Sequence, residues 1–279
     1  QNNNKIPAKI RNIHRKKGKN MKALGFIGMG NMAKAIAEGI IRSGKVNGSD
    51  IYAYAPHQDK LKKNAQAIGF TACESMEVLL READTIVMAC KPYQIEGVLA
   101  EYKDALAGKA LISIAAGWDY AKYKPLLDET TRVQFIMPNT PAMVGEGVLL
   151  FEETNSLEEQ ERKELMELFS VLGLVEEIPT HLMGIAGTLT GCGPAFIDLV
   201  IEALGDAGVK YGVPRAQAYA LVSQMILGSA KLQLKTGEHP GVLKDNVCSP
   251  AGTTIRGVNA LDRAGLRAAF LDAVDAIME

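Results

Sequence analysis

The chain has 279 residues, of which 47% are apolar and 23% are charged, a composition typical of a globular protein of about two domains that excludes overall disorder. Its four cysteines form no CxxC pair and have no histidines at zinc-finger spacing, so the sequence predicts no metal site, no disulfide framework and a reducing, cytoplasmic location. The formal net charge of −1 hides a strongly basic start.

Residues 1–20 carry seven Lys or Arg and no Asp or Glu. A basic arm of this kind can bind nucleic acid or an anionic membrane. However, a clean strand pattern begins only after Met21, and the Asn-rich start is typical of upstream or added sequence. We therefore expect a leader outside the fold, and a protein that binds no nucleic acid and no membrane. The leader has no apolar core of signal-peptide length, so we predict no secretion. We expect no long uncharged run elsewhere in the chain, and therefore no membrane span.

From Ala23 the sequence alternates short apolar runs with helical stretches, a pattern that predicts a parallel sheet covered by helices on both faces. The strands are rich in Ile, Val and Leu without strict alternation, as expected when both faces are buried. In chain order we predict strands at 23–27, 51–55, 85–90, 110–115 and 132–137, with two short ones near 147–151 and 174–178. Helices are predicted at 31–42, 58–67, 93–103 and 157–172.

Beyond Pro179 the strand signals stop, so we divide the chain into an α/β domain at 21–179 and an all-α domain at 180–279. Two predicted helices of the second domain, 194–207 and 216–234, are apolar over most of their circumference, and such helices are buried on all sides. A lone domain of this size can hardly bury both, so we expect a second copy of the chain to cover them. The alternative is an ordinary bundle core with a few exposed apolar residues.

The first predicted strand runs directly into Gly28, Gly30 and Ala33, which have the G-x-G-x-x-A spacing of a Rossmann-type dinucleotide-binding turn. Gly28 permits the tight turn, Gly30 lets the backbone approach a pyrophosphate, and Ala33 allows close packing of helix on strand. The pyrophosphate then lies at the positive end of the helix. The alternative is a turn that only joins a strand to a helix.

Ligands of open α/β sheets gather at the carboxyl ends of the strands, so the other strand ends supply further candidates. No carboxylate follows the second strand before Asp59, which permits the 2′-phosphate of NADP beside His57 and Lys60; NAD is the alternative cofactor. Lys91 fits either the general acid of an alcohol dehydrogenase or a solvated loop lysine. The predicted cofactor contacts are Ile27, Gly28, Met29, Gly30, Asn31, Met32, Ala55, Pro56, His57, Ser75, Ala89, Cys90, Lys91, Pro92, Ala115, Ala116, Gly117 and Asn139.

A second polar cluster lies in the helical half. Ser249 followed by Pro250 predicts an N-cap with proline at the first helical position. Gly252 and the hydroxyls of Thr253 and Thr254 would then present N–H and O–H donors suited to a small carboxylate. The alternative is a well-capped helix that binds nothing.

These segments resemble the pyrroline-5-carboxylate reductase family, from Met21 to the C-terminus. The residues that carry the resemblance are Ser249 to Ile255, with His239-Pro240 and Leu243-Lys244-Asp245 before them, and Gly193-Pro194-Ala195, Ala207-Gly208-Val209, Gly212-Val213-Pro214-Arg215, Lys91-Pro92 and Met137-Pro138-Asn139-Thr140-Pro141. The resemblance implies NAD(P)H-dependent reduction of L-1-pyrroline-5-carboxylate to L-proline, the last step of proline biosynthesis. It also implies that the all-α domain is the dimerisation and substrate domain, with interleaved helices; assembly beyond the dimer is left open.

On this resemblance the predicted catalytic residue is Thr254, which would hydrogen-bond the ring nitrogen. The predicted substrate-binding residues are Glu238, Ser249, Gly252, Thr253 and Thr254. A hydroxyl suffices because an imine is far more basic than a ketone. Each site would combine the cofactor domain of one chain with helices of the partner. The sequence departs from the family pattern at Ala251, where a glycine is usual, and at Phe135, Cys192 and Phe196.

Two other functions were weighed. A dehydrogenase of the 3-hydroxyisobutyrate or 6-phosphogluconate type shares this domain order but needs a lysine on the long interdomain helix to move an alcohol proton. Residues 191–206 contain no lysine, and Lys210 comes late. A non-catalytic NAD(P)-sensing protein on the same fold would be expected to lose the substrate cluster, which this sequence retains.

Overall fold

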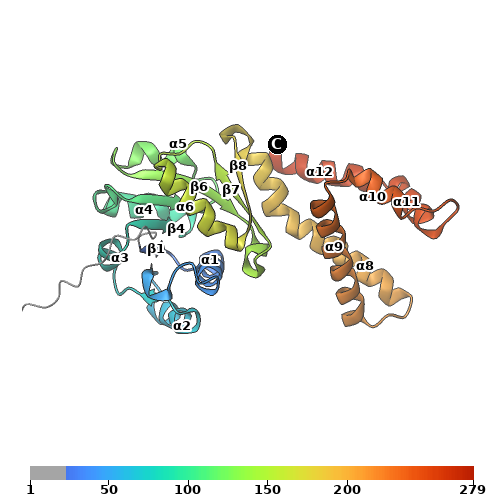
Figure 1. Cartoon of the computed structure of the whole chain (residues 1–279), viewed down its shortest axis with the longest axis horizontal. Coiled ribbons are helices and arrows are strands. Elements are labelled where there is room, and N and C mark those ends of the chain that lie inside the picture. Colours follow the sequence, from blue (N-terminus) through green and yellow to red (C-terminus); the bar gives the residue numbers. More distant parts are fainter. Residues whose placement is uncertain (1–22) are drawn as a thin grey trace, which may run out of the picture.

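The structure is a computed structural model that describes residues 23–279, so the predicted basic leader lies outside the described residues. Figure 1 shows two parts placed one after the other along the longest axis of the molecule. A sheet with its helices forms one part, and helices alone form the other. The predicted fold class, an α/β Rossmann-type domain followed by an all-α domain, is confirmed.

The sheet has eight strands in the order β3-β2-β1-β4-β5-β6-β7-β8. Strands β1 to β6 are parallel to one another, whereas β7 runs antiparallel to β6 and β8 runs parallel to β7. The strands are β1 (Leu24–Ile27), β2 (Ile51–Tyr54), β3 (Thr71–Ala72), β4 (Thr85–Met88), β5 (Ala110–Ser113), β6 (Arg132–Pro138), β7 (Gly147–Glu152) and β8 (Gly173–Ile178). The predicted parallel sheet is thus correct for six strands, and the reversal at β7 is a departure from it.

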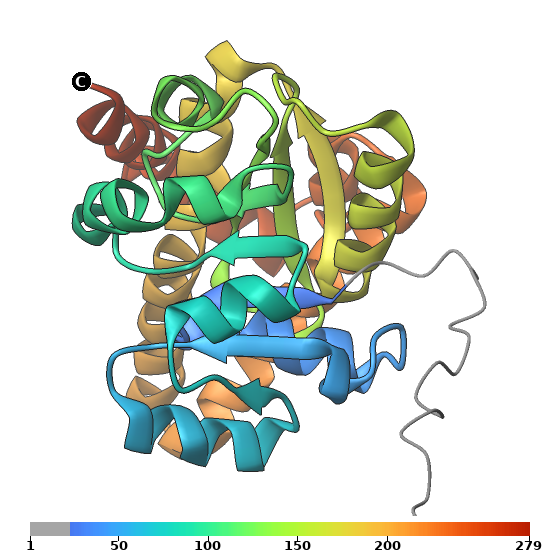
Figure 2. The ribbon, with the colours of Figure 1, turned by 90° about the vertical axis from the view of Figure 1, so that its left-hand side faces the viewer.

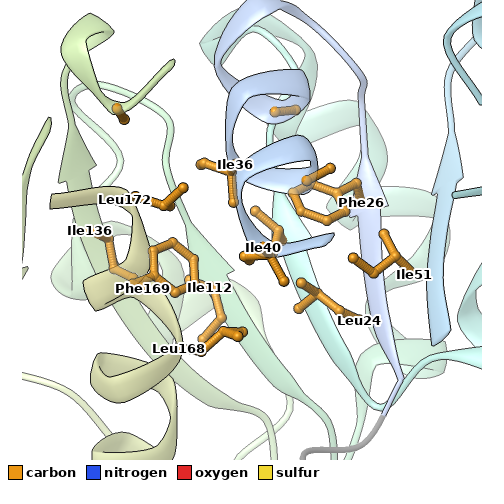
Figure 3. Close-up of a cluster of buried hydrophobic side chains, with 14 of the residues drawn as sticks. Leu24, Phe26, Ile36, Ile40, Ile51, Ile112, Ile136, Leu168, Phe169 and Leu172 are labelled. Carbon is orange, nitrogen blue, oxygen red and sulfur yellow. The ribbon is translucent and has the colours of Figure 1, made fainter. Parts of the chain in front are cut away.

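Helices cover both faces of the sheet. They are α1 (Asn31–Arg42), α2 (Gln58–Ile68), α3 (Met76–Glu82), α4 (Pro92–Tyr102), α5 (Tyr120–Tyr123) and α6 (Glu159–Phe169), with short 3₁₀ turns η1 (Gly48–Asp50), η2 (Lys103–Leu106), η3 (Lys124–Leu126), η4 (Thr140–Val144) and η5 (Ser170–Leu172). On one face, Ile36 and Ile40 of α1 pack against Phe26 of β1 and against two residues that follow one another closely, Phe169 at the end of α6 and Leu172 of η5 (Figure 3). Helices α3 and α4 supply a separate core on the other face. This packing fixes the strand ends that form the candidate cofactor site.

The second part begins after β8. It consists of η6 (Thr180–Leu182), α7 (Met183–Gly187), a π-helical turn η7 (Thr188–Cys192), α8 (Gly193–Lys210), α9 (Arg215–Thr236), α10 (Pro240–Asn246), α11 (Thr253–Arg263) and α12 (Leu266–Met278). Helices α8 and α9 lie side by side, so closely that a Cβ on Gly205 would stand 2.4 Å from the ring of Tyr219. The predicted helices 194–207 and 216–234 correspond to α8 and α9.

Within one chain, the helical part has almost no core. Of its hydrophobic side chains, only Met183 and Ala218 are buried. Of the 25 exposed large hydrophobic residues among those described, 20 belong to residues 180–279. The alternative of an ordinary bundle core with a few exposed apolar residues is therefore wrong for the single chain.

One helical stretch, Thr180–Lys210, is long and apolar enough to cross a membrane by length and composition alone. It has 31 residues, a mean hydropathy of 1.5 in the window that meets this test, and 11% of that window buried. No Asp, Glu, Lys or Arg occurs between Glu177 and Asp198, so the expectation that the chain has no long uncharged run is wrong. A single stretch of this kind is weak evidence for a membrane span, because a helix that packs against other protein has the same composition.

Candidate functional site

The turn after β1 has a backbone that only glycine fits. Gly28 has a φ of +94°, and a Cβ there would stand 2.8 Å from the carbonyl oxygen of Ala89 and 2.8 Å from the amide nitrogen of Cys90. The Gly28 N–H donates to the Tyr54 carbonyl at 2.8 Å, which ties the turn to β2. Gly28 therefore holds the ends of β1, β2 and β4 together, as its predicted role requires.

Gly30 meets a different requirement. It is the N-cap of α1, is exposed, and has no atom within 4 Å of the position that a Cβ would take. The first turn of α1 contains no acidic residue and its N-cap has no side-chain hydrogen bond, so no side chain of this turn neutralises the positive end of the helix dipole. Ala33 is 1% exposed and packs into the core below. The turn thus forms an open cradle in which a pyrophosphate fits and which a side chain at residue 30 would fill.

The end of β2 forms a shallow hollow beside this turn. Its lining residues are Pro56, His57, Gln58, Asp59 and Lys60. His57 is the N-cap residue of α2 but its side chain makes no capping hydrogen bond, and Gln58 fixes the loop by donating to the carbonyls of Ala55 at 3.0 Å and Cys73 at 3.2 Å. The structure therefore brings His57 and Lys60 into one hollow, together with the carboxylate of Asp59.

The next strand ends also open toward this edge of the sheet. Helix α4 begins at Pro92, four residues beyond Met88 at the end of β4. The Lys91 N–H donates to Oε1 of Gln94 at 3.1 Å, and the Lys91 side chain is exposed. Burial raises the pKa of the Cys90 thiol to about 11, so at neutral pH it is a protonated thiol rather than a nucleophile. Ala116 and Gly117 are exposed after β5, with Gly117 at a φ of +74°. These small residues leave the backbone accessible to a flat ligand.

Two of the predicted cofactor residues make structural contacts. The Ser75 hydroxyl caps α3 by accepting from the Val78 N–H at 3.4 Å. Asn139, which is 7% exposed, accepts from the Val148 N–H at 2.8 Å and donates through Nδ2 to the Thr190 carbonyl at 3.0 Å. Its amide therefore spans the two parts of the chain.

The candidate substrate cluster lies at the start of α11. Gly252, not Ser249, is the N-cap residue, so the predicted helix start at Pro250 is wrong. Residues 249–252 form a turn in which the Gly252 N–H donates to the Ser249 carbonyl at 2.9 Å. The turn places Ala251 at a φ of +59°, where it is the one non-glycine residue of positive φ among the described residues. Proline can follow Ser249 here because it starts a turn rather than a helix.

Two hydroxyls of this cluster make no hydrogen bond to the described part of the chain. Thr253 and Thr254 are the first two residues of α11, both are exposed, and neither side chain makes a hydrogen bond within residues 23–279. Gly252 lies close to Ser249, because a Cβ there would stand 2.3 Å from Oγ and 3.0 Å from the carbonyl oxygen of Ser249. Glu238 is exposed in the loop between α9 and α10, next to His239, whose Nδ1 accepts from the Gly241 N–H at 3.0 Å. The helix start therefore presents free N–H and O–H donors.

The two clusters do not meet within one chain. In Figure 1, α10 and α11 lie in the helical part, away from β1 and α1 in the sheet part. Figure 2, viewed from the sheet end, shows the sheet in front and the orange and red helices behind it. A single chain therefore carries the glycine turn of the sheet part and the exposed start of α11 as two separate clusters, which do not form one site.

Sequence reasoning missed two residues that shape the site. Gln58 fixes the loop after β2, and the signal was a long polar side chain at the first helical position after a strand. The backbone carbonyl of Thr190 accepts a hydrogen bond from the Asn139 amide. The signal was Pro194, four residues later, because proline has no N–H to donate to that carbonyl. Neither signal identifies the distant partner, because Cys73 lies 15 residues from Gln58 and Thr190 lies 51 residues from Asn139.

Fold and glycine turn define a class: a Rossmann-type nucleotide-binding protein with a helical second part. Residues 180–279 match a family model described as pyrroline-5-carboxylate reductase dimerisation, and residues 23–117 match one described as NADP oxidoreductase, coenzyme F420-dependent. The chain belongs to the pyrroline-5-carboxylate reductase family, because relatives of that name are up to 41% identical over most of both chains.

The similarity spans nearly the whole chain. A pyrroline-5-carboxylate reductase of Treponema pallidum is 41% identical, covering 91% of this chain and 98% of the relative, and that of Escherichia coli is 39% identical, covering 92% and 96%. The crystal structure of the Plasmodium falciparum pyrroline carboxylate reductase with NADP bound has a TM-score of 0.83 at 34% identity, covering 92% of this chain and 95% of that one. A Coxiella burnetii pyrroline-5-carboxylate reductase has a TM-score of 0.85 at 30% identity, with coverages of 92% and 96%.

Proposed function

We propose that the protein reduces L-1-pyrroline-5-carboxylate to L-proline, the last step of proline biosynthesis, with NADPH as electron donor and NADH as the alternative. The observation that carries the proposal is the pairing, in one chain of this family, of the Gly28–Gly30 cradle with the free hydroxyls at the start of α11. The two alternatives, a 3-hydroxyacid dehydrogenase and a non-catalytic NAD(P)-sensing protein, are not favoured. The relatives that match over most of the chain are pyrroline-5-carboxylate reductases.

The residues at the carboxyl edge of the sheet fit a dinucleotide. The first turn of α1 would hold the pyrophosphate, and His57 with Lys60 would hold a 2′-phosphate in the hollow after β2. The backbone around Ala116 and Gly117 would support the nicotinamide end. The cofactor, when bound, supplies the hydride. The match to an NADP oxidoreductase model and the NADP in the Plasmodium relative support NADP over NAD.

The start of α11 would bind and orient the substrate. Its N–H groups, with Ser249 and Thr253, would hold the carboxylate of the ring, while Thr254 would hydrogen-bond the imine nitrogen and hold its proton there. Glu238 is proposed as a further contact from the loop between α9 and α10. An imine is basic enough that a hydroxyl suffices in place of a strong acid, and orientation of the C=N carbon supplies most of the rate.

The active unit would be a homodimer. Within one chain the two halves of the site are far apart, and 20 exposed large hydrophobic residues of the helical part have nothing to cover them. A second copy that interleaves its helices with these would bury them and bring its α11 to the cofactor edge of the first chain. The match of residues 180–279 to a dimerisation domain supports this arrangement. In such a dimer the partner chain, rather than lipid, would cover the apolar stretch Thr180–Lys210. Further assembly of dimers stays a prediction, as does a cytoplasmic location.

The proposal is tested by following NADPH and NADH oxidation with pyrroline-5-carboxylate, beside NADP reduction with a 3-hydroxyacid in the reverse direction. Turnover of the imine, faster with NADPH, is expected. Turnover of the hydroxyacid alone would contradict the proposal.

A further inference from the structure

We propose that Asn139 is a positioning residue that locks the cofactor domain onto the long helix that leads to the dimerisation surface. The contact is specific: one buried amide bonds both parts of the chain at the same time. Its structural role stands on the geometry alone, whereas its effect on turnover rests on the function proposed above.

Both polar atoms of the Asn139 amide are used. Oδ1 accepts from the Val148 N–H at 2.8 Å, within the sheet part, and Nδ2 donates to the Thr190 carbonyl at 3.0 Å, 51 residues further along the chain. The side chain is 7% exposed, so these bonds are shielded from water and their loss leaves buried polar groups unpaired. A buried, doubly bonded amide fixes orientation as well as distance.

The residue that would bond the Thr190 carbonyl in a regular helix cannot donate to it. In a regular helix it would accept from the N–H four residues later, but that residue is Pro194, which has no N–H. The chain accommodates the proline with the π-helical turn Thr188–Cys192, flanked by Gly193. Asn139 therefore supplies the donor that Pro194 lacks.

The packing around this contact is close. A Cβ on Gly187 would stand 2.2 Å from Sδ of Met137 at the end of β6, so the helix lies directly against the strand two residues before Asn139. The Thr190 hydroxyl is already bonded to the Ala186 carbonyl at 2.9 Å and leaves the backbone carbonyl as the acceptor for the amide. The junction therefore holds one arrangement of helix and sheet.

A small change at this junction is amplified along α8. Its 18 residues span about 27 Å, so a tilt of about 5° at Gly193 moves the far end by about 2 Å. In the proposed dimer, α8 connects the cofactor domain to the surface that holds the partner's α11. A loosened junction would misplace the substrate against the cofactor, and misplacements of this size are costly for turnover.

The test compares Asn139→Asp with Asn139→Ala. The aspartate keeps the acceptor for Val148 but loses the donor to Thr190, whereas alanine removes both bonds without adding charge. The matched control is Asn155→Ala, because the Asn155 amide also bonds two backbone groups, Glu153 and Leu157, but within a single loop. NADPH affinity, dimer mass, steady-state kinetics and hydrogen–deuterium exchange of residues 186–195 are measured for each.

Both Asn139 variants are expected to bind NADPH within about twofold of the unchanged protein and to remain dimeric, while kcat falls by about tenfold or more and exchange over residues 186–195 accelerates. The Asn155 variant should leave all four readings unchanged. A tenfold weaker NADPH affinity with unchanged kcat at saturating cofactor and unchanged exchange would make Asn139 a cofactor contact and overturn the proposal. If the unchanged protein binds NADPH but does not reduce pyrroline-5-carboxylate, the proposed function fails, while the exchange measurement still decides whether the lock exists.

Discussion

A site divided between two chains predicts that two inactive variants restore activity when they share a dimer. One variant is Gly30→Asp, which places a carboxylate in the pyrophosphate cradle; because no atom lies within 4 Å of a Cβ there, the fold should tolerate it. The other is Thr254→Ala, which removes a hydroxyl that makes no hydrogen bond within the described part of the chain. The first should lose cofactor binding, and the second should lose about tenfold to a hundredfold in turnover.

In a mixed dimer the two defects fall on the same site. If the cofactor domain of one chain works with α11 of its partner, one site combines both defects and the other has neither. Co-expression with two different tags and tandem purification isolates this species, which should show about half the specific activity of the unchanged dimer. If each site instead lay within one chain, every site would carry one defect, and the mixed dimer would be no more active than the Thr254→Ala homodimer. That result would refute the shared site.

The remaining predictions concern single residues. The Thr254→Ala variant should keep the melting temperature of the unchanged protein, because alanine is the better helix former. The Thr254→Ser variant keeps a hydroxyl and should recover much of the lost kcat. Unchanged kinetics in the alanine variant would remove Thr254 from the mechanism. Burial raises the pKa of Glu152, whose Oε1 has no hydrogen-bond partner among residues 23–279, so ionisation of this carboxyl destabilises the fold. Its contribution is fully favourable below the unfolded carboxyl pKa of about 4.3 and is lost as the pH rises through the higher folded pKa. Glu152→Gln should therefore raise the melting temperature at pH 8 but not at pH 4, and an equal shift at both would contradict this. Ala251→Gly should stabilise the protein by about 1 kcal/mol, seen in thermal unfolding, because it relieves a side chain held at a φ of +59°; a loss of stability would refute the strain.

The sheet part was largely predictable from the sequence. Helix α1 has the predicted bounds, Asn31–Arg42, because a glycine turn precedes it and its apolar positions repeat with helical period. The short elements β3 and α3 were missed, since two strand residues and seven helical residues carry little periodic signal. The direction of β7 was also unpredicted, because strand patterns contain no information on orientation.

The candidate site was predictable only where a local motif carries its own chemistry. The conformations of Gly28 and Gly30 followed from the spacing of the glycines, and the hydroxyls of Thr253 and Thr254 followed from their place at a helix start. The N-cap at Ser249 was wrong because Ser-Pro also begins a turn, and nothing local distinguishes the two. The Asn139 contact with Thr190 joins residues 51 apart, so it depends on how the two parts pack.

The most direct test of NADPH-dependent reduction of pyrroline-5-carboxylate is to measure proline and oxidised cofactor together. Purified protein is incubated with NADPH and L-1-pyrroline-5-carboxylate, and both products are quantified over time, with the Gly30→Asp variant as the control for cofactor dependence. The unchanged protein should form equal amounts of L-proline and NADP at all times, and the Gly30→Asp variant should form neither product. Oxidation of NADPH without proline, or no reaction with the imine while a 3-hydroxyacid is oxidised by NADP, would contradict it.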